Sequence, residues 1–105
     1  MQLVNRGYIL VQPLQPFIDW AAKIDPELSI GQDHEPSVYL IEEDFFDEEP
    51  IIKANYKSIF VTELEAVSEE ESDFPEINMA NFEAWFTVSL GSTVIDTMSE
   101  TLDRD

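Results

Sequence analysis

The sequence contains no cysteine, one histidine and only five basic residues among its 105. Without cysteine there are no disulfides, no thiolate zinc sites and no thiol catalysis. A single histidine cannot build a histidine-rich zinc or iron site within one chain. Direct nucleic-acid binding depends on clustered lysine and arginine, so these scattered basic residues argue against it. We therefore expect no resident metal, no cofactor and no direct contact with nucleic acid.

Long hydrophobic runs and glycine-rich loops are also missing. A membrane-spanning helix needs about 18 or more consecutive apolar residues, and no such run occurs, so no membrane contact is expected. The three glycines, Gly7, Gly31 and Gly91, are too scattered to form a phosphate-binding loop. The first residues lack the apolar stretch of a signal peptide, which favours a cytoplasmic setting.

Acidic residues dominate what is present. The chain has 23 of them and a formal net charge of −18, with 44% hydrophobic and 11% aromatic residues, as is usual for a folded domain. Thirteen acidic residues lie between Glu42 and Glu76, where only Lys53 and Lys57 oppose them, so thirteen negative against two positive charges give this segment −11. Such a surface repels polyanions and anionic lipids and attracts cations and basic proteins.

Hydrophobic patterning predicts a single α+β domain over residues 1–98 and a frayed polar tail over residues 99–105. Strands are expected over residues 8–11, 38–41 and 87–96. Helices are expected over residues 16–24, 47–67 and 78–86. The order β-α-β-α-α-β predicts a three-stranded sheet packed by three helices. A helix between the first two strands further predicts that they run parallel.

Single residues refine these boundaries. Pro16 suits the first turn of the first helix, while Asp47 and Asn78 can cap the second and third helices. Gly91 predicts a bulge or bend within the last strand. The alternative is a hairpin that folds back at Gly91 and Ser92.

The succession of short motifs resembles a known family. The motifs are Asn5-Arg6, QPFIDW (Gln15 to Trp20), VYLI (Val38 to Ile41), an acidic helix, and NFEAWF (Asn81 to Phe86) before a final strand. Together they resemble a family of short acidic bacterial proteins for which no activity is established, and the likeness covers nearly the whole chain. The resemblance implies one domain in the bacterial cytoplasm and assigns no chemistry.

The segment Glu42–Glu49 is the candidate partner-binding site. Phe45 and Phe46 lie there between acidic residues on both sides, namely Glu42, Glu43, Asp44, Asp47, Glu48 and Glu49. An exposed ring inside an anionic rim suits a basic protein partner. The alternative is that one ring packs at the edge of the core beside the helix start. Because the run departs from the spacing of a calcium-binding loop, only weak binding of divalent cations is expected.

Arg6 is the second candidate, because it directly precedes the first strand in a very acidic chain. We expect it to pair with Asp19 or with a residue of the acidic segment, or else to anchor an anionic ligand. The leading interpretation is a small domain that binds, buffers or inhibits a basic protein, as a monomer or weak homodimer. The alternatives are an enzyme or ligand-binding domain with a pocket near Arg6 and Asp19, and a DNA mimic. Mimicry needs a continuous track of carboxylates, whereas the long helix has acids only at its ends.

Overall fold

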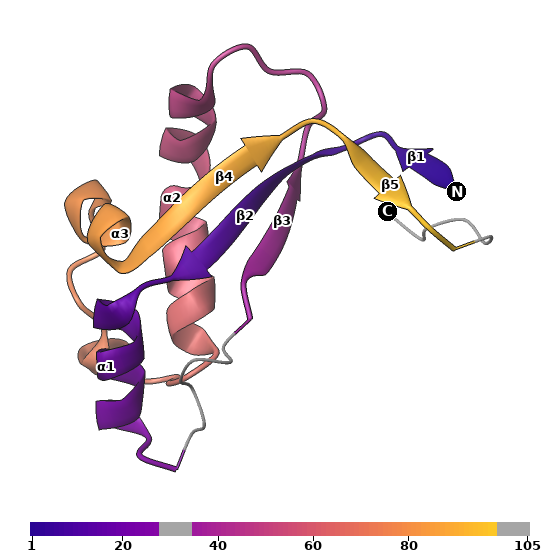
Figure 1. Cartoon of the computed structure of the whole chain (residues 1–105). Coiled ribbons are helices and arrows are strands. Elements are labelled where there is room, and N and C mark those ends of the chain that lie inside the picture. The colour runs from indigo at the N-terminus through magenta and orange to yellow at the C-terminus, as the bar shows by residue number, and fades with distance from the viewer. Residues whose placement is uncertain (28–34, 99–105) are drawn as a thin grey trace.

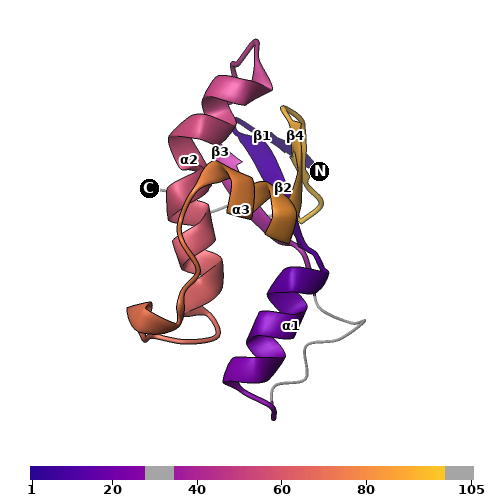
Figure 2. The same ribbon diagram turned by 90° about the vertical axis from the view of Figure 1, so that its left-hand side faces the viewer.

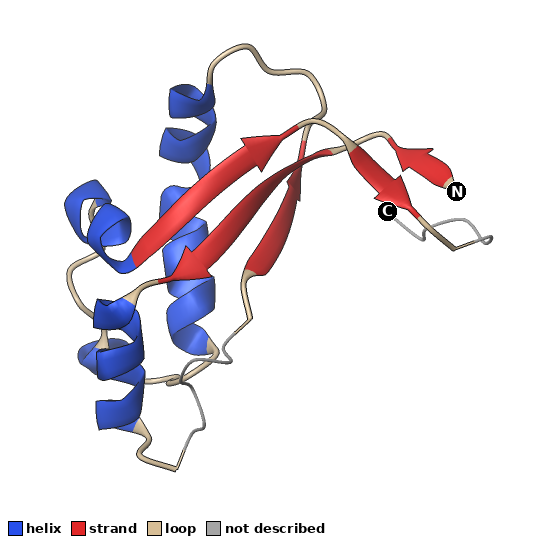
Figure 3. Ribbon diagram, in the orientation of Figure 1, coloured by secondary structure: helices blue, strands red, loops and turns tan. Residues whose placement is uncertain are grey.

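The structure is a computed structural model that describes residues 1–27 and 35–98. In chain order its elements are β1 (Gln2–Val4), β2 (Gly7–Pro13), α1 (Gln15–Ile24), β3 (Ser37–Ile41), α2 (Glu48–Glu65), the 3-10 turn η1 (Glu71–Asp73), α3 (Met79–Trp85), β4 (Phe86–Gly91) and β5 (Val94–Asp96). Figures 1 and 3 show their arrangement. The predicted tail, residues 99–105, lies outside the described residues.

The predicted α+β class is confirmed, and the described parts of the chain contain three α-helices. The prediction of one three-stranded sheet is wrong, because the strands form two sheets. One has three strands in the order β3-β2-β4, and the other is a two-stranded ribbon of β1 and β5. The predicted element order is also wrong, since β1 precedes the first expected strand and the last expected strand is divided into β4 and β5.

The predicted parallel pairing is wrong as well, because β2 runs antiparallel to both of its neighbours. A crossover helix packs on the face of its sheet. Helix α1 instead continues beyond the end of β2 and does not lie on the face of the sheet (Figure 1). The backbone N–H of Leu14 donates to the carbonyl oxygen of Trp85 at 2.8 Å, which ties the start of α1 to the end of α3. Helices α2 and α3 cover the sheet face that a crossover helix would occupy (Figure 2).

The hydrophobic core lies between this sheet face and the helices. Its buried side chains are Ile9, Val11, Phe17, Ala21, Ile59, Phe60, Leu64, Phe82 and Phe86. The ring of Phe60 is central, with its centroid 5.8 Å from that of Phe82 and 5.7 Å from that of Phe86. Helix α2 thus contributes Ile59, Phe60 and Leu64 to the core.

Two of the three predicted helix-start features are confirmed. Pro16 lies in the first turn of α1, and the side-chain oxygen of Asn78 accepts the backbone N–H of Asn81 at 2.8 Å. Asp47 occupies the N-cap position of α2, but its side chain makes no capping hydrogen bond. The negative charge of Asp47 still lies near the positive end of the helix dipole.

The β1–β5 ribbon continues the β2–β4 pair after a bend. Val4 pairs with Val94 and Tyr8 pairs with Gly91, so three residues on one strand lie opposite two on the other. The ladder is therefore interrupted on both strands, and the strands divide there into two sheets. The bend predicted at Gly91 is confirmed, because β4 ends at this residue and the chain bends before β5 (Figure 1). The hairpin alternative is wrong, because the chain runs on into β5.

Candidate functional site

The predicted partner-binding segment forms the connection between β3 and α2 (Figure 1). Strand β3 ends at Ile41 and helix α2 begins at Glu48, so the loop is short. Six acidic side chains on or beside this loop are exposed, namely Glu42, Glu43, Asp44, Asp47, Glu48 and Glu49. The structure therefore places every acidic residue of the predicted site at the surface, on one continuous stretch of chain.

The two phenylalanines of this loop have opposite environments. The side chain of Phe46 is fully exposed, at 104% of its reference area. Phe45 is partly buried against the start of β2, and its Cε1 atom would lie only 3.2 Å from a Cβ atom on Gly7. That Cβ would also lie 2.9 Å from the carbonyl oxygen of Glu42, so glycine is needed where the loop closes over β2. The exposed ring of the predicted site is therefore Phe46, while Phe45 lies beside the start of β2.

The negative charge of the loop is almost uncompensated. Within the described residues the single ion pair joins Lys53 Nζ to Glu49 Oε1 at 3.3 Å, and both side chains are exposed. Exposed pairs of this kind contribute little to stability. No three histidine, cysteine, aspartate or glutamate side chains in residues 1–27 and 35–98 gather into a group that could hold a metal ion. The charge of the loop therefore faces solvent.

Arg6 and Asp19 do not meet, and the predicted ion pair between them is wrong. Arg6 directly precedes β2, whereas Asp19 lies in α1, which follows the other end of that strand. Arg6 Nη1 donates to the carbonyl oxygen of Asn5 at 2.7 Å, and Asp19 Oδ1 accepts from Gln15 Nε2 at 2.8 Å. The strand separates the two side chains by its full length. The pocket predicted beside them is therefore also wrong.

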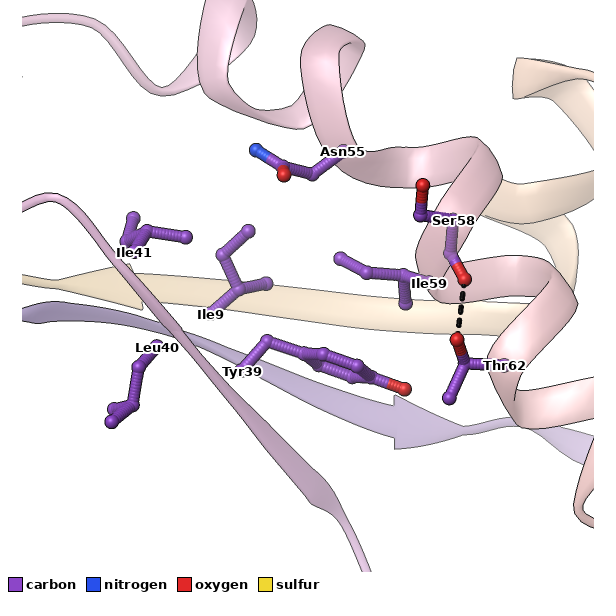
Figure 4. A pocket seen from close by; sticks show the side chains of 8 residues that line it. All are labelled: Ile9, Tyr39, Leu40, Ile41, Asn55, Ser58, Ile59 and Thr62. Carbon is purple, nitrogen blue, oxygen red and sulfur yellow. Dashed lines mark hydrogen bonds between the residues drawn. The ribbon is translucent and has the colours of Figure 1, made fainter. Parts of the chain in front are cut away.

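A hollow that the sequence analysis missed lies between β3 and α2 (Figure 4). It has a volume of about 160 Å³ and is lined by Ile9, Tyr39, Leu40, Ile41, Asn55, Ser58, Ile59 and Thr62. Its base is apolar, and its helix side is polar but uncharged. A signal in the sequence could have indicated it, because Asn55, Ser58 and Thr62 recur at the spacing of one helix face.

A hydrogen bond between Tyr39 and Glu63 connects the two walls of this hollow. The hydroxyl of Tyr39 on β3 donates to Glu63 Oε2 on α2, and Figure 4 shows this hydroxyl pointing toward the helix. Burial raises the pKa of Tyr39, and the hydrogen bond to Glu63 and its charge raise the pKa further. The phenol is therefore neutral near pH 7, where it acts as a structural donor.

No protein-family model, curated protein or solved structure matches the chain. The resemblance to short acidic bacterial proteins therefore stays a prediction. No helix in residues 1–27 and 35–98 is both long enough and apolar enough to cross a membrane. The assignment of function accordingly depends on the geometry of the acidic loop and its surroundings.

Proposed function

We propose that this small acidic protein acts in the cytoplasm by binding a basic protein partner through the loop Glu42–Glu49, and so regulates or inhibits that partner. The observation that carries the proposal is the full exposure of Phe46 between two groups of exposed acidic side chains. A phenylalanine ring gains free energy when it is removed from water. A partner that covers Phe46 would supply that burial.

The charge of the loop favours a basic partner. Acidic side chains on both sides of Phe46 attract cationic surfaces over roughly a Debye length, about 8 Å at physiological ionic strength. Such attraction accelerates encounter and selects the sign of the partner, while the buried ring slows dissociation. Binding should therefore weaken steeply as salt rises.

The two alternative functions have less support. Arg6 and Asp19 form no common pocket, which leaves the predicted enzyme or ligand site without its residues. The acidic residues of α2 lie at its two ends, and Lys53 and Lys57 lie between them. Duplex DNA presents one charge about every 1.7 Å, so this helix lacks the even track of carboxylates that mimicry requires.

The proposal is tested by affinity capture from an extract of the source cell at low salt, with elution at high salt. Immobilised wild-type protein is compared with Phe46→Ser and with Met98→Ser, which changes an exposed apolar residue outside the loop. A polyglutamate resin measures retention by charge alone. We expect a basic protein that the wild type and Met98→Ser retain, and that Phe46→Ser and the polyglutamate resin do not.

A pair of charge variants locates the binding surface. Glu42→Gln with Glu43→Gln removes two charges from the loop, and Glu69→Gln with Glu70→Gln removes two exposed charges from the segment after α2. The captured protein, once purified, should bind the first variant several-fold more weakly than the second. Equal weakening would show that only net charge matters. Retention of every basic protein to the same extent as on polyglutamate would refute a specific partner.

A further inference from the structure

We infer that the basic partner binds by strand addition, with an extended segment that pairs with the free edge of β3. This inference rests on the proposed function, because it takes the partner to be basic, and it specifies how the partner is held. Strand addition supplies main-chain hydrogen bonds for affinity and alternating side-chain contacts for specificity. The edge, the two faces beside it and the adjacent charge each support this mode.

The edge of β3 lacks the usual protection against pairing. Its one neighbour in the sheet is β2, and no strand in residues 1–27 and 35–98 pairs with its other side. Exposed edges commonly carry charged side chains, prolines or bulges that block a further strand. The residues Ser37–Ile41 contain no charge and no proline. In a chain with a net charge of −18, an uncharged edge strand is available for pairing.

The outer face beside this edge is apolar and exposed. Val38 is 58% exposed and Leu40 is 47% exposed. In the register of the sheet they lie beside Leu10 and Tyr8 of β2, both of which are partly exposed. Outward-facing side chains of an added strand would cover Val38 and Leu40, as cross-strand pairs do in a continuous sheet.

The inner face beside the same edge is hollow. Side chains of an added strand that point inward would lie next to Tyr39 and Ile41, over the cavity of about 160 Å³ shown in Figure 4. The helix side of that cavity carries Asn55, Ser58 and Thr62, none of them charged. A further depression on α2 continues from Ser58 and Thr62 to Val61 and Lys57. An inward apolar or hydroxyl side chain therefore has space on this side.

The position of the acidic residues orients the added segment. Glu42, Glu43 and Asp44 follow directly after Ile41, the last residue of β3. Basic residues of the segment should lie at that end, and its alternating apolar part should lie along β3. Every strand pair in the structure is antiparallel. In the same arrangement, the basic residues would be at the N-terminal end of the added segment.

A peptide series tests this inference directly. The parent is the octapeptide KRKVTVTV, and its affinity for the full chain is measured by calorimetry at low and moderate salt. Two further peptides carry two N-methyl groups each, one on its first two valines and the other on both of its threonines. Alternate N–H groups of a strand point to opposite sides, so strand addition predicts that one methylated peptide loses about tenfold or more in affinity and the other much less.

Protein variants test the inner hollow with the same parent peptide. Ser58→Tyr fills the hollow from α2, and Ala84→Tyr places the same side chain at an exposed position on α3. We expect Ser58→Tyr to weaken binding several-fold and Ala84→Tyr to leave it unchanged. Hydrogen exchange at the backbone amides of Ser37–Ile41 should slow when the peptide binds to the wild type. Circular dichroism of both variants controls for their folding.

The outcomes separate this inference from the proposed function. If both methylated peptides bind as tightly as the parent, and salt weakens all three equally, binding is electrostatic without strand addition. If the parent peptide does not bind but a basic protein is captured through Phe46, strand addition is again overturned while the proposed function holds. Dimerisation of the free protein that Ser58→Tyr abolishes would assign the edge to a second copy and overturn the inference.

Discussion

The hydroxyl of Tyr39 donates a hydrogen bond to the carboxylate of Glu63, 24 residues further along the chain, and so fastens the edge strand β3 to the long helix α2. Tyr39 lines the hollow that we propose as part of the docking surface. The bond therefore joins the strand and the helix that form the two sides of this hollow.

Loss of this hydroxyl should destabilise the protein. We expect Tyr39→Phe to lower the free energy of unfolding by about 1 to 2 kcal/mol, because it removes a partly buried hydrogen bond to a charged group. Urea denaturation at pH 7 measures the effect. The matched control is Tyr8→Phe, which removes a hydroxyl from the open face of the sheet. Equal losses in the two variants would contradict the role given to the bond.

The same hydroxyl makes stability depend on alkaline pH. Because the pKa of Tyr39 is raised in the folded protein, above pH about 10 the unfolded chain binds fewer protons than the folded chain. The contribution of Tyr39 is complete below that pH and is lost as pH rises further. The stability difference between wild type and Tyr39→Phe should therefore shrink above pH about 10 in urea denaturation. A constant difference across this range would contradict the assignment.

The two N-cap positions should respond differently to alanine. Asn78→Ala removes a side-chain capping bond from α3 and should cost about 1 kcal/mol of stability. Asp47→Ala removes no such bond from α2, and it also removes one charge from a repulsive cluster. Thermal denaturation of the two variants provides the comparison. A larger loss for Asp47→Ala would show that the dipole of α2 depends on this carboxylate.

A buried and an exposed phenylalanine should also differ in how much their replacement by alanine lowers stability. Phe60 is fully buried, and Phe60→Ala should cost about 3 to 5 kcal/mol, since it leaves a cavity in the core. Phe46→Ala removes an exposed ring and should change stability by less than about 0.5 kcal/mol. Urea denaturation of both variants tests the contrast. A large loss in Phe46→Ala would mean that this ring supports the fold.

Salt should stabilise this chain. A net charge of −18 with one ion pair in the described residues leaves carboxylates that repel one another. Raising sodium chloride from about 10 mM to 0.15 M shortens the Debye length from about 30 Å to 8 Å, so the melting temperature should rise. Choline chloride should have the same effect, because the cause is screening. A rise with sodium alone would indicate specific ion binding.

Local patterns predicted the helices but not the direction of the strands. Asn78 marks a helix start because its side chain accepts a hydrogen bond from a residue nearby in the sequence. Pro16 marks one because it has no backbone N–H to donate. The direction of β3 depends on where α1 packs, and α1 packs at the end of the sheet, where Phe17 contacts Trp85 and Phe86. Those contacts span most of the chain. A rule for crossover helices therefore failed, because it assumes that the helix lies on the sheet.

The candidate site likewise has features that the sequence could predict and features that it could not. The exposure of Phe46 was predictable, because a short loop of acidic residues has few ways to bury two adjacent rings. The separation of Arg6 and Asp19 was predictable as well, because the strand expected over residues 8–11 lies between them and carries the chain across the sheet. The hollow beside Tyr39 depends on the spacing between β3 and α2. The hydrogen bond from Tyr39 to Glu63 joins these two elements across 24 residues, and no local pattern contains it.

The bent ribbon also determines how the molecule would respond to tension. Gln2 and Asp96 are partners in adjacent strands. The start of β1 and the end of β5 therefore lie side by side. A force that pulls these ends apart would peel the ribbon open one residue pair at a time, starting at its tip. The interruption of the ladder then marks the place where peeling meets the three-stranded sheet and its packed helices. A tether at either end would thus strain the ribbon first and leave the acidic loop undisturbed.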